Sequence, residues 1–574
     1  MSAPTGSRGD YEVRLLALLA VCVSVVSFLY CYRHDEVLLY GDAVAHINIA
    51  RRVFDSKTPG LLQLGTVWLP LPHLLILPFV VSQRLWQQGA GGSIPSMAAY
   101  VFGVVGIFRL ARGMVGAAPR LGLKSTAARA DPMTASRSAG TRPAGIAAWT
   151  AALIYGANPN LIYMQTTAMG EVLYLAFFLW AVVYFSEYVR EQDPGEQARS
   201  LTRCGLCLAA ACLTRYDGWF LAGVVVVAAV AVTVRSHLAQ KAHSGGAPLR
   251  TAVVKFVLLA AAGPVLWLAY NAAIYRHPLE FATGPYSARA IEKKTGTINP
   301  AKDNVYAGSS YFLKAAELNV GEAAWQGRLW LVGAVLGSLL AWFGDRGRAV
   351  LLLWLPLPFY ALSMAYGSVP IFVPPWWPYS HYNLRYGLQL LPAFAVFIGL
   401  AVAFLVDLGK KFSGPSAGRG RGWGSAAAVL VFFLLVGGSY LEIWRAGPIC
   451  YQEAAVNMHS RVVLEKELAV LLEKLPPDST LLMYLGDHVG ALERGGIRLR
   501  RVINEGNHRV WKQPEDPEGL WERALADPAS HADYVVGFEG DRVWEAALGK
   551  HLPELVELHT AGQPRAILYQ GRLR

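Results

Sequence analysis

Charged residues are scarce in this 574-residue chain, at 16% of the total, whereas hydrophobic residues make up 54% and the mean hydropathy is +0.33. Soluble domains carry about 25% charged residues. This shortage excludes an ordinary soluble protein and predicts one that crosses a membrane several times. The net charge of +12 is then explained by Lys and Arg retained in cytoplasmic loops, so no nucleic acid partner is needed.

Two kinds of signature are also missing. The six cysteines have no spacing typical of a disulfide framework, and Cys204 and Cys207 lie inside an apolar run, where packing is the favoured role. There is no P-loop and no H-E-x-x-H motif, so the nucleotide hydrolases and zinc proteases that those motifs mark are not expected. No small-residue cleavage site follows the first apolar run, which predicts an uncleaved first span.

Eleven apolar segments are long enough, or nearly so, to cross ~30 Å of hydrocarbon. They lie at residues 15–32, 94–110, 144–163, 170–188, 201–214, 219–234, 252–274, 329–343, 350–366, 388–408 and 426–444. The predicted fold class is therefore an α-helical polytopic membrane protein of about eleven transmembrane helices. A soluble α/β domain is expected at its C-terminal end.

Basic residues crowd three loops, at 109–142, 235–255 and 410–421. The positive-inside rule places all three in the cytoplasm, which is consistent only if residues 73–86 lie along the interface instead of crossing it. We therefore predict a bacterial-type cytoplasmic (inner) membrane protein with a cytoplasmic N-terminus. The external loops are then 33–93 and 275–328. The Ala-, Gly-, Ser- and Arg-rich segments 117–143 and 409–424 are expected to be disordered.

The composition changes after residue 445, which suggests a membrane module at 1–445 and an extracytoplasmic α/β domain at 446–574. Period-2 and period-3.6 patterns predict strands at 480–485, 499–504, 533–538 and 566–570, and helices at 452–475, 520–526 and 542–550. Polar residues at 487–488 and 504–508 follow the first two strands, where open α/β sheets often bind ligands. Ordinary polar turns are the favoured interpretation.

The segment from Tyr40 to Pro78 carries the chemistry. Read as a helix over 42–54, it places Asp42 and His46 on one face at i,i+4 and turns apolar residues the other way. An amphipathic interfacial helix or a solvated connecting loop both fit. A carboxylate just outside the membrane suits a general base acting on a hydroxyl acceptor, and Asp42 is that candidate.

This segment resembles the first external loop of the C-type (GT-C) membrane glycosyltransferases, especially the protein O-mannosyltransferase and aminoarabinose-transferase group. An acidic residue opens a helix that ends Ile49-Ala50-Arg51, and Pro70-Leu71-Pro72-His73-Leu74 follows. The group's Asp-Glu pair falls on Asp42-Ala43, so its Glu is missing. The resemblance implies a base role for Asp42, with Asp35, of Asp35-Glu36, as the alternative.

The resemblance extends to two further places. Glu171 matches a second acidic residue at an external helix start, and Arg385-Tyr386 matches an Arg-Tyr after an external loop. Arg385 is expected on the outer surface, where a guanidinium can pair with a lipid phosphate, and Tyr382 and Tyr386 can line a groove. Asp217 can join them. Each has a simpler interpretation. Glu171 can be an interfacial residue beside a helix N-terminus, Arg385 can anchor the chain at the membrane surface within an aromatic belt, and Asp217 can end a helix.

A divalent metal remains an open alternative. His46, His73 and His381 are all predicted to face outside, so a site with Asp42 can be drawn, but the spacing is not diagnostic. Otherwise His46 and His73 are predicted to contact substrate. No cofactor is required by any motif, and the identity of a metal stays unknown.

The predicted function is an inverting glycosyltransferase that uses a polyprenyl-phosphate-linked sugar at the outer face of the membrane. Its acceptor is a lipid, a glycan or a protein. Asp42 and Glu171 are the predicted catalytic residues, and Arg385, Tyr386, His46, His73, Tyr382 and Asp217 the predicted substrate contacts. A lipid or sugar transporter without chemistry is the main alternative. A second alternative is that the C-terminal domain is a binding module and the membrane part only its anchor, although eleven spans exceed what an anchor needs.

Overall fold

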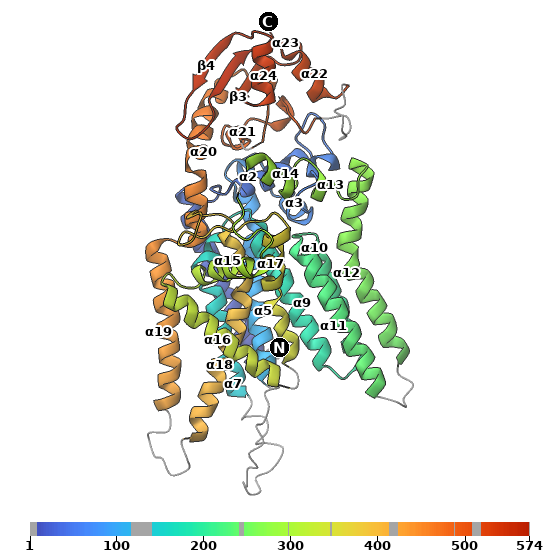
Figure 1. The fold of residues 1–574 in the computed structure, drawn as a ribbon, viewed down its shortest axis with the longest axis vertical. Coiled ribbons are helices and arrows are strands. Elements are labelled where there is room, and N and C mark those ends of the chain that lie inside the picture. Colours follow the sequence, from blue (N-terminus) through green and yellow to red (C-terminus); the bar gives the residue numbers. More distant parts are fainter. Residues whose placement is uncertain are drawn as a thin grey trace, which may run out of the picture.

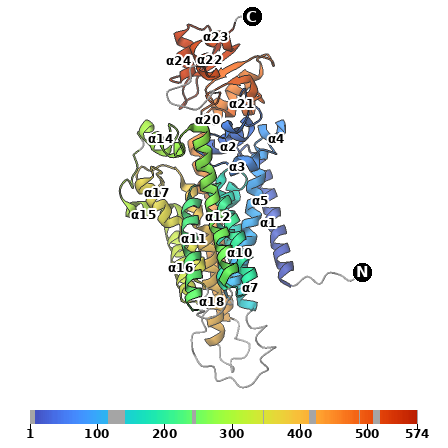
Figure 2. The same cartoon turned by 90° about the vertical axis from the view of Figure 1, so that its right-hand side faces the viewer.

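A helical bundle forms one end of the molecule and a smaller α/β domain the other (Figure 1). The computed structural model describes residues 8–115, 141–239, 246–296, 298–344, 347–412, 423–486, 488–507 and 518–572. Most of the two segments predicted to be disordered, 117–143 and 409–424, falls outside these ranges. The first helix starts at the end opposite the C-terminal domain (Figure 2), as an odd number of spans requires.

Within the described residues, nine helices are long and apolar enough to cross a membrane. Eight are α1 (Arg8–Arg33), α5 (Ala90–Met114), α9 (Gly170–Arg190), α11 (Asp217–Ala239), α12 (Gly246–Tyr275), α16 (Ala324–Phe343), α17 (Pro356–Tyr366) with the 3-10 turn η3 (Arg348–Trp354), and α18 (Leu391–Phe412) with η4 (Leu384–Leu390). The ninth runs from α19 (Trp423–Ala446) into α20 (Ile449–Glu473). This is a multi-pass membrane protein.

Two of the eleven predicted segments form helices that are too short or too polar to be counted among these nine. The shorter helix α7 (Thr141–Gly156) is apolar, and α10 (Pro194–Cys212) is polar in its first half. The core of the bundle is formed by α9 and α18, because 78% of the apolar window of each is buried, whereas for α1 the share is 22%. Most of the surface of α1 is therefore left for lipid.

Residues 33–93, predicted to be external and called the external loop below, contain short helices that cover the bundle. They are α2 (Gly41–Arg52), η1 (Leu61–Leu64), α3 (Leu71–Ile76) and α4 (Gln83–Gln87). Since α3 and α4 are only six and five residues long, residues 73–86 do not cross the membrane. The expected one-sided, interfacial form of α2 is wrong: Ala43, Val44, His46 and Ile47 are all buried, as are Asn48 and Arg51. His46, on the face that was expected to meet solvent, bonds His73 of the same loop, and Asn48 bonds Glu493 of the C-terminal domain.

A second region outside the spanning helices, which was also predicted to be external, follows α12. It contains α13 (Glu280–Thr283), α14 (Ala288–Thr295) and α15 (Val305–Leu318). The C-terminal domain contains a five-stranded sheet in the order β2-β1-β3-β5-β4. Its strands are β1 (Leu481–Met483), β2 (Val502–Ile503), β3 (Tyr534–Phe538), β4 (Glu554–Leu558) and β5 (Ala566–Gln570), with helices α21 (Gly490–Arg494), α22 (Leu520–Ala526), α23 (Pro528–His531) and α24 (Arg542–Gly549).

The four predicted strands are present, although β1 and β2 are shorter than expected. β2, β1 and β3 are parallel, whereas β5 runs antiparallel to β3 and β4 to β5. β4 was not among the predicted strands. This edge strand carries two glutamates and is almost wholly exposed, so it lacks the alternation by which half-buried strands are recognised.

The C-terminal domain rests on the external loop. Asn507 donates to the hydroxyls of Ser56 (3.2 Å) and Thr58 (2.8 Å), and Gln63 donates to the carbonyl of Gly506 (2.8 Å). These contacts give the polar turn after β2 a structural role, in line with the favoured interpretation. Asp487 and His508, of the same two turns, lie outside the described residues.

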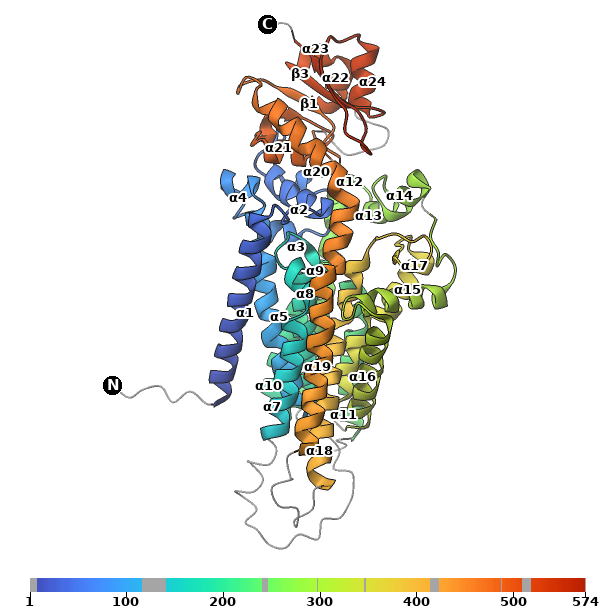
Figure 3. The ribbon, with the colours of Figure 1, turned by 90° about the vertical axis from the view of Figure 1, so that its left-hand side faces the viewer.

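The helix α20 joins the two parts of the chain and continues the line of α19 (Figure 3). Its first turns bury Cys450 and Glu453 against the membrane helices, and its last turns bury Leu468 and Leu472 in the C-terminal domain. A boundary at residue 445 therefore assigns to the outer domain a helix that serves both parts.

Candidate active site

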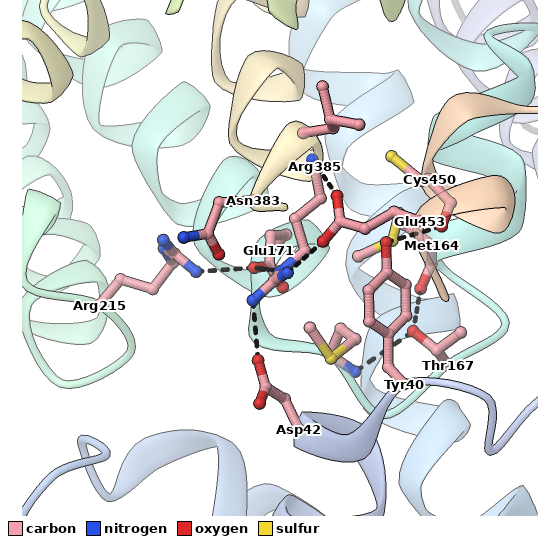
Figure 4. Close-up of polar contacts among 12 residues, drawn as sticks. Tyr40, Asp42, Met164, Thr167, Glu171, Arg215, Asn383, Arg385, Cys450 and Glu453 are labelled. Carbon is pink, nitrogen blue, oxygen red and sulfur yellow. Dashed lines mark hydrogen bonds and ion pairs between the residues drawn. The ribbon is translucent and has the colours of Figure 1, made fainter. Parts of the chain in front are cut away.

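Arg385 lies at the centre of a cluster of carboxylates (Figure 4), at the end of the bundle next to the C-terminal domain. Its guanidinium bonds Asp42 through Nη2 (2.8 Å), Glu171 through Nε (3.1 Å) and Glu453 through Nη1. Its backbone N–H also donates to Glu453 (3.1 Å). The carboxylates come from α2, α9 and α20, so the cluster joins the external loop, the central helix and the linking helix.

A second arginine extends the cluster. Arg215 donates to Glu171 (2.9 Å), to Asp217 (3.1 Å) and to the hydroxyl of Tyr360 (3.1 Å). Tyr360 in turn donates to Asp217 at 2.8 Å. Glu171 therefore accepts from both arginines, which holds the two cations at a fixed separation.

The ring of Tyr386 contacts both cations, with its centroid 4.8 Å from the guanidinium carbon of Arg215 and 5.1 Å from that of Arg385. Arg385 also faces the ring of Tyr40 at 5.3 Å. Such contacts favour cations because the ring faces are electron-rich. Tyr382 forms an isolated bridge with Phe372, and the two rings are tilted relative to each other with their centroids 5.5 Å apart.

Exposure separates Asp42 from the other three carboxylates. The Asp42 side chain is 41% exposed, whereas those of Glu171 and Glu453 are 2% exposed and that of Asp217 is 6% exposed. Arg385 was expected at the surface and is buried instead. Three of its polar contacts therefore point into the protein, and the contact with Asp42 points outwards.

The two histidines of the external loop bond each other instead of the carboxylates. His46 Nδ1 and His73 Nε2 are 2.8 Å apart, and both rings are buried. Burial lowers the pKa of His46, and burial together with His46 and Arg52 lowers the pKa of His73 well below its usual range. Both imidazoles are therefore neutral at pH 7.

The structure does not bring together Asp42 and the three histidines that were considered as metal ligands. Asp42 pairs with Arg385, and the His381 carbonyl accepts from Asn457 (2.7 Å). Throughout the part of the chain that the structure describes, no group of three or more His, Cys, Asp or Glu side chains is arranged to hold a metal ion.

Three residues of the cluster were missed from the sequence. Arg215 stands two residues before the predicted Asp217, so a scan for basic partners in the same turn would have found it. Glu453 was assigned to the outer domain by its polar surroundings. Tyr360 sits in an apolar span with no distinguishing pattern.

Asp35 lies apart from the cluster and links the external loop to the C-terminal domain. It pairs with Lys466 (2.7 Å) and Arg494 (3.3 Å). These ion pairs lower the pKa of Asp35 against the opposing effect of its partial burial. Of the two aspartates considered for the base role, Asp42 is the one beside Arg385.

The C-terminal domain contacts α2 through a buried carboxyl group. Asn48 donates to Glu493 at 2.8 Å, and Trp86 donates to Asn48 at 3.0 Å. Burial raises the pKa of Glu493 to about 8. This carboxyl is therefore largely protonated at pH 7, because burial disfavours its charged form more than the hydrogen bond from Asn48 favours it.

We expect the folded protein to lose stability as the pH rises, because Glu493 must then ionise at a buried position. Because the folded-state pKa exceeds the ordinary value of 4.5, the stabilisation is complete below pH 4.5 and is lost as the pH rises through about 8. In that window the wild type should lose roughly 1.4 kcal/mol of unfolding free energy per pH unit relative to Glu493→Gln. Thermal unfolding at several pH values measures the difference. The exposed Glu545→Gln serves as the control, and parallel curves for wild type and Glu493→Gln would contradict the expectation.

Neither a family model nor a curated protein matches this sequence. The structure, however, matches two crystal structures of ArnT from Cupriavidus metallidurans. The one bound to undecaprenyl phosphate has a TM-score of 0.53 at 15% identity, and the apo form 0.54 at 14%, each covering 98% of both chains. The Archaeoglobus fulgidus oligosaccharyltransferase in complex with Zn and sulfate aligns at a TM-score of 0.45 and 12% identity, over 97% of this chain and 73% of that one. The chain thus has the fold of ArnT, and the resemblance to GT-C enzymes is confirmed at the level of fold.

Proposed function

We propose that this protein is an inverting glycosyltransferase that moves a sugar from a polyprenyl-phosphate donor to a hydroxyl group of a lipid, glycan or protein. The observation that carries the proposal is the ion pair between Asp42, an exposed carboxylate, and Arg385. Two buried carboxylates, Glu171 and Glu453, hold Arg385 in place on its other side. The ArnT fold supports the donor class, because ArnT was crystallised with undecaprenyl phosphate.

The proposed reaction forms one bond and breaks another at the anomeric carbon of the sugar. The acceptor oxygen attacks that carbon and gives its proton to Asp42, while the bond from the carbon to the phosphate oxygen breaks. Polyprenyl phosphate leaves with the electron pair, and its negative charge is stabilised by Arg385. Glu171 takes no proton in this scheme; it positions Arg385 and Arg215.

The pair between Asp42 and Arg385 implies an order of binding. A phosphate that reaches Nη2 of Arg385 displaces the Asp42 carboxylate, because the other nitrogens remain bound to Glu171 and Glu453. Displacement frees Asp42 to accept a proton. The donor should therefore bind before the acceptor, and the carboxylate should be released as a base only when the donor is present.

A donor panel tests the proposal. Purified protein is incubated with different polyprenyl-phosphate sugars and acceptor extracts, and the release of polyprenyl phosphate is measured. Release that requires both an acceptor and Asp42 supports the transferase. Movement of a lipid-linked sugar across a vesicle membrane without any release would support the transporter instead. Product-inhibition patterns with the active donor report the binding order.

The proposed orientation puts the cluster and the C-terminal domain outside the cytoplasm, since the basic helix ends lie at the other end of the bundle. A phosphatase fused at the C-terminus should then be active and a green fluorescent reporter dark. The reverse result would invert the molecule and place the site in the cytoplasm.

A further inference from the structure

A basic groove lies between α10 and α12, at the end of the bundle away from the carboxylate cluster. These two helices pack side by side (Figure 2). The groove has a volume of about 430 Å³, and its polar lining consists of Arg199, Thr202, Arg203, Thr251 and Lys255. Nothing in the proposed transfer reaction uses it.

The spacing of the side chains produces two facing rows. Arg199 and Arg203 are four residues apart on α10, and Thr251 and Lys255 are four residues apart on α12. Residues at i,i+4 share one face of a helix. Each helix therefore presents its row to the other across the groove.

Two of the three cations of this groove have no acidic partner within the described residues. Arg203 and Lys255 make no hydrogen bond or ion pair within the described residues; Arg203 only faces the ring of Tyr184 at 5.8 Å. Arg199 pairs with Glu196, but both side chains are largely exposed, and such pairs contribute little. No carboxylate lines the groove.

Two other grooves provide the comparison. The one between α1, α5 and α9 has four arginines, but Asp10 and Glu187 lie among them. The one beside α20 contains Asp35 and Glu473 together with its cations. In both, acidic side chains offset part of the positive charge, so the groove between α10 and α12 is the one suited to an anion.

Apolar side chains continue each row towards the middle of the membrane. Leu206 follows Arg203 by three residues and is 54% exposed, and Leu258 follows Lys255 by three residues and is 67% exposed. A ligand that fits this surface has an anionic head and an apolar tail. Free phosphate would use the cations but would leave the leucine surface uncovered.

We propose that this groove binds the headgroup of an anionic phospholipid from the leaflet at that end of the bundle. The phosphodiester lies against Arg203 and Lys255, and the acyl chains lie along Leu206 and Leu258. Bound in this way, the lipid clamps α10 to α12. Since Arg215 follows α10 directly, the clamp also supports the helix that positions the second cation of the candidate active site.

Lipid titration of the purified full chain in neutral detergent tests the proposal. Phosphatidylglycerol should bind, as counted by native mass spectrometry and by a rise in melting temperature, and phosphatidylcholine should not. Arg203→Gln with Lys255→Gln should weaken phosphatidylglycerol binding about 10- to 30-fold, because juxtamembrane cations contribute to anionic-lipid affinity roughly additively.

The matched control is Arg235→Gln with Arg348→Gln, which removes two exposed cations at the same end but outside the groove. It should bind phosphatidylglycerol as the wild type does. Equal losses in the two double variants, or none in the groove variant, would overturn the site. Equal protection by inorganic phosphate would overturn the lipid assignment. If the double variant does not fold, the same binding is measured with Lys255→Gln alone. This single variant should fold, because Lys255 is exposed and has no partner among the described residues.

Discussion

Replacing Asp42 with Asn is expected to lower the rate of sugar transfer by ~10²–10⁴ while the protein stays folded and binds donor. Asn keeps the size of Asp and an oxygen that can accept from Arg385, but it cannot take the proton of the acceptor. Because the Asp42 side chain is 41% exposed, the substitution leaves no buried group without a partner. The rate of polyprenyl phosphate release by purified protein measures the effect.

Asp35→Asn is the control for this prediction. Asp35 pairs with Lys466 and Arg494 at an exposed site, so its loss should change stability slightly and leave the rate within a few-fold of wild type. A larger rate loss in Asp35→Asn than in Asp42→Asn would show that the Asp-Glu motif had been aligned seven residues too late. If neither variant lost activity, the proposed mechanism would fail.

Arg385→Ala should have the largest effect on folding. Arg385 was expected at the surface, where an arginine can be removed at little cost; the buried Arg385 instead compensates Glu171 and Glu453. Breaking a buried ion pair by removing one partner costs about 3–5 kcal/mol, since the remaining charge is left without compensation. The melting temperature and the yield of purified protein should both fall sharply.

Two further variants distinguish the effect of the positive charge of Arg385 from the effect of the geometry of its guanidinium. Arg385→Ala combined with Glu453→Gln should recover part of the lost stability, because one uncompensated carboxylate is removed. Arg385→Lys keeps the charge but has no planar fork, so it should fold better than Ala and still bind donor weakly. Arg109→Ala, which breaks a partly exposed pair with Glu187, should cost at most about 1 kcal/mol. A stable Arg385→Ala variant would contradict the role of Arg385 at the centre of the cluster.

The sequence determined the parts of this protein that depend on local composition. Membrane spans follow from apolar length, because an unpaired backbone cannot cross hydrocarbon, and the strands of the C-terminal domain follow from period-2 patterning, except for the exposed edge strand β4. The same local information located Asp42 at the start of a helix just outside a span.

Only the tertiary structure decided which of the candidate residues meet. Arg385, Glu171 and Asp42 are more than 120 residues apart from one another in the chain, and Glu453 lies beyond them in a segment whose composition pointed to another domain. Local patterns cannot report such long-range pairs. The burial of α2 was hidden for the same reason: His46 meets His73 of the same loop, and Asn48 meets Glu493 of the C-terminal domain. A pattern of polar residues is the same whether water or another part of the protein satisfies it.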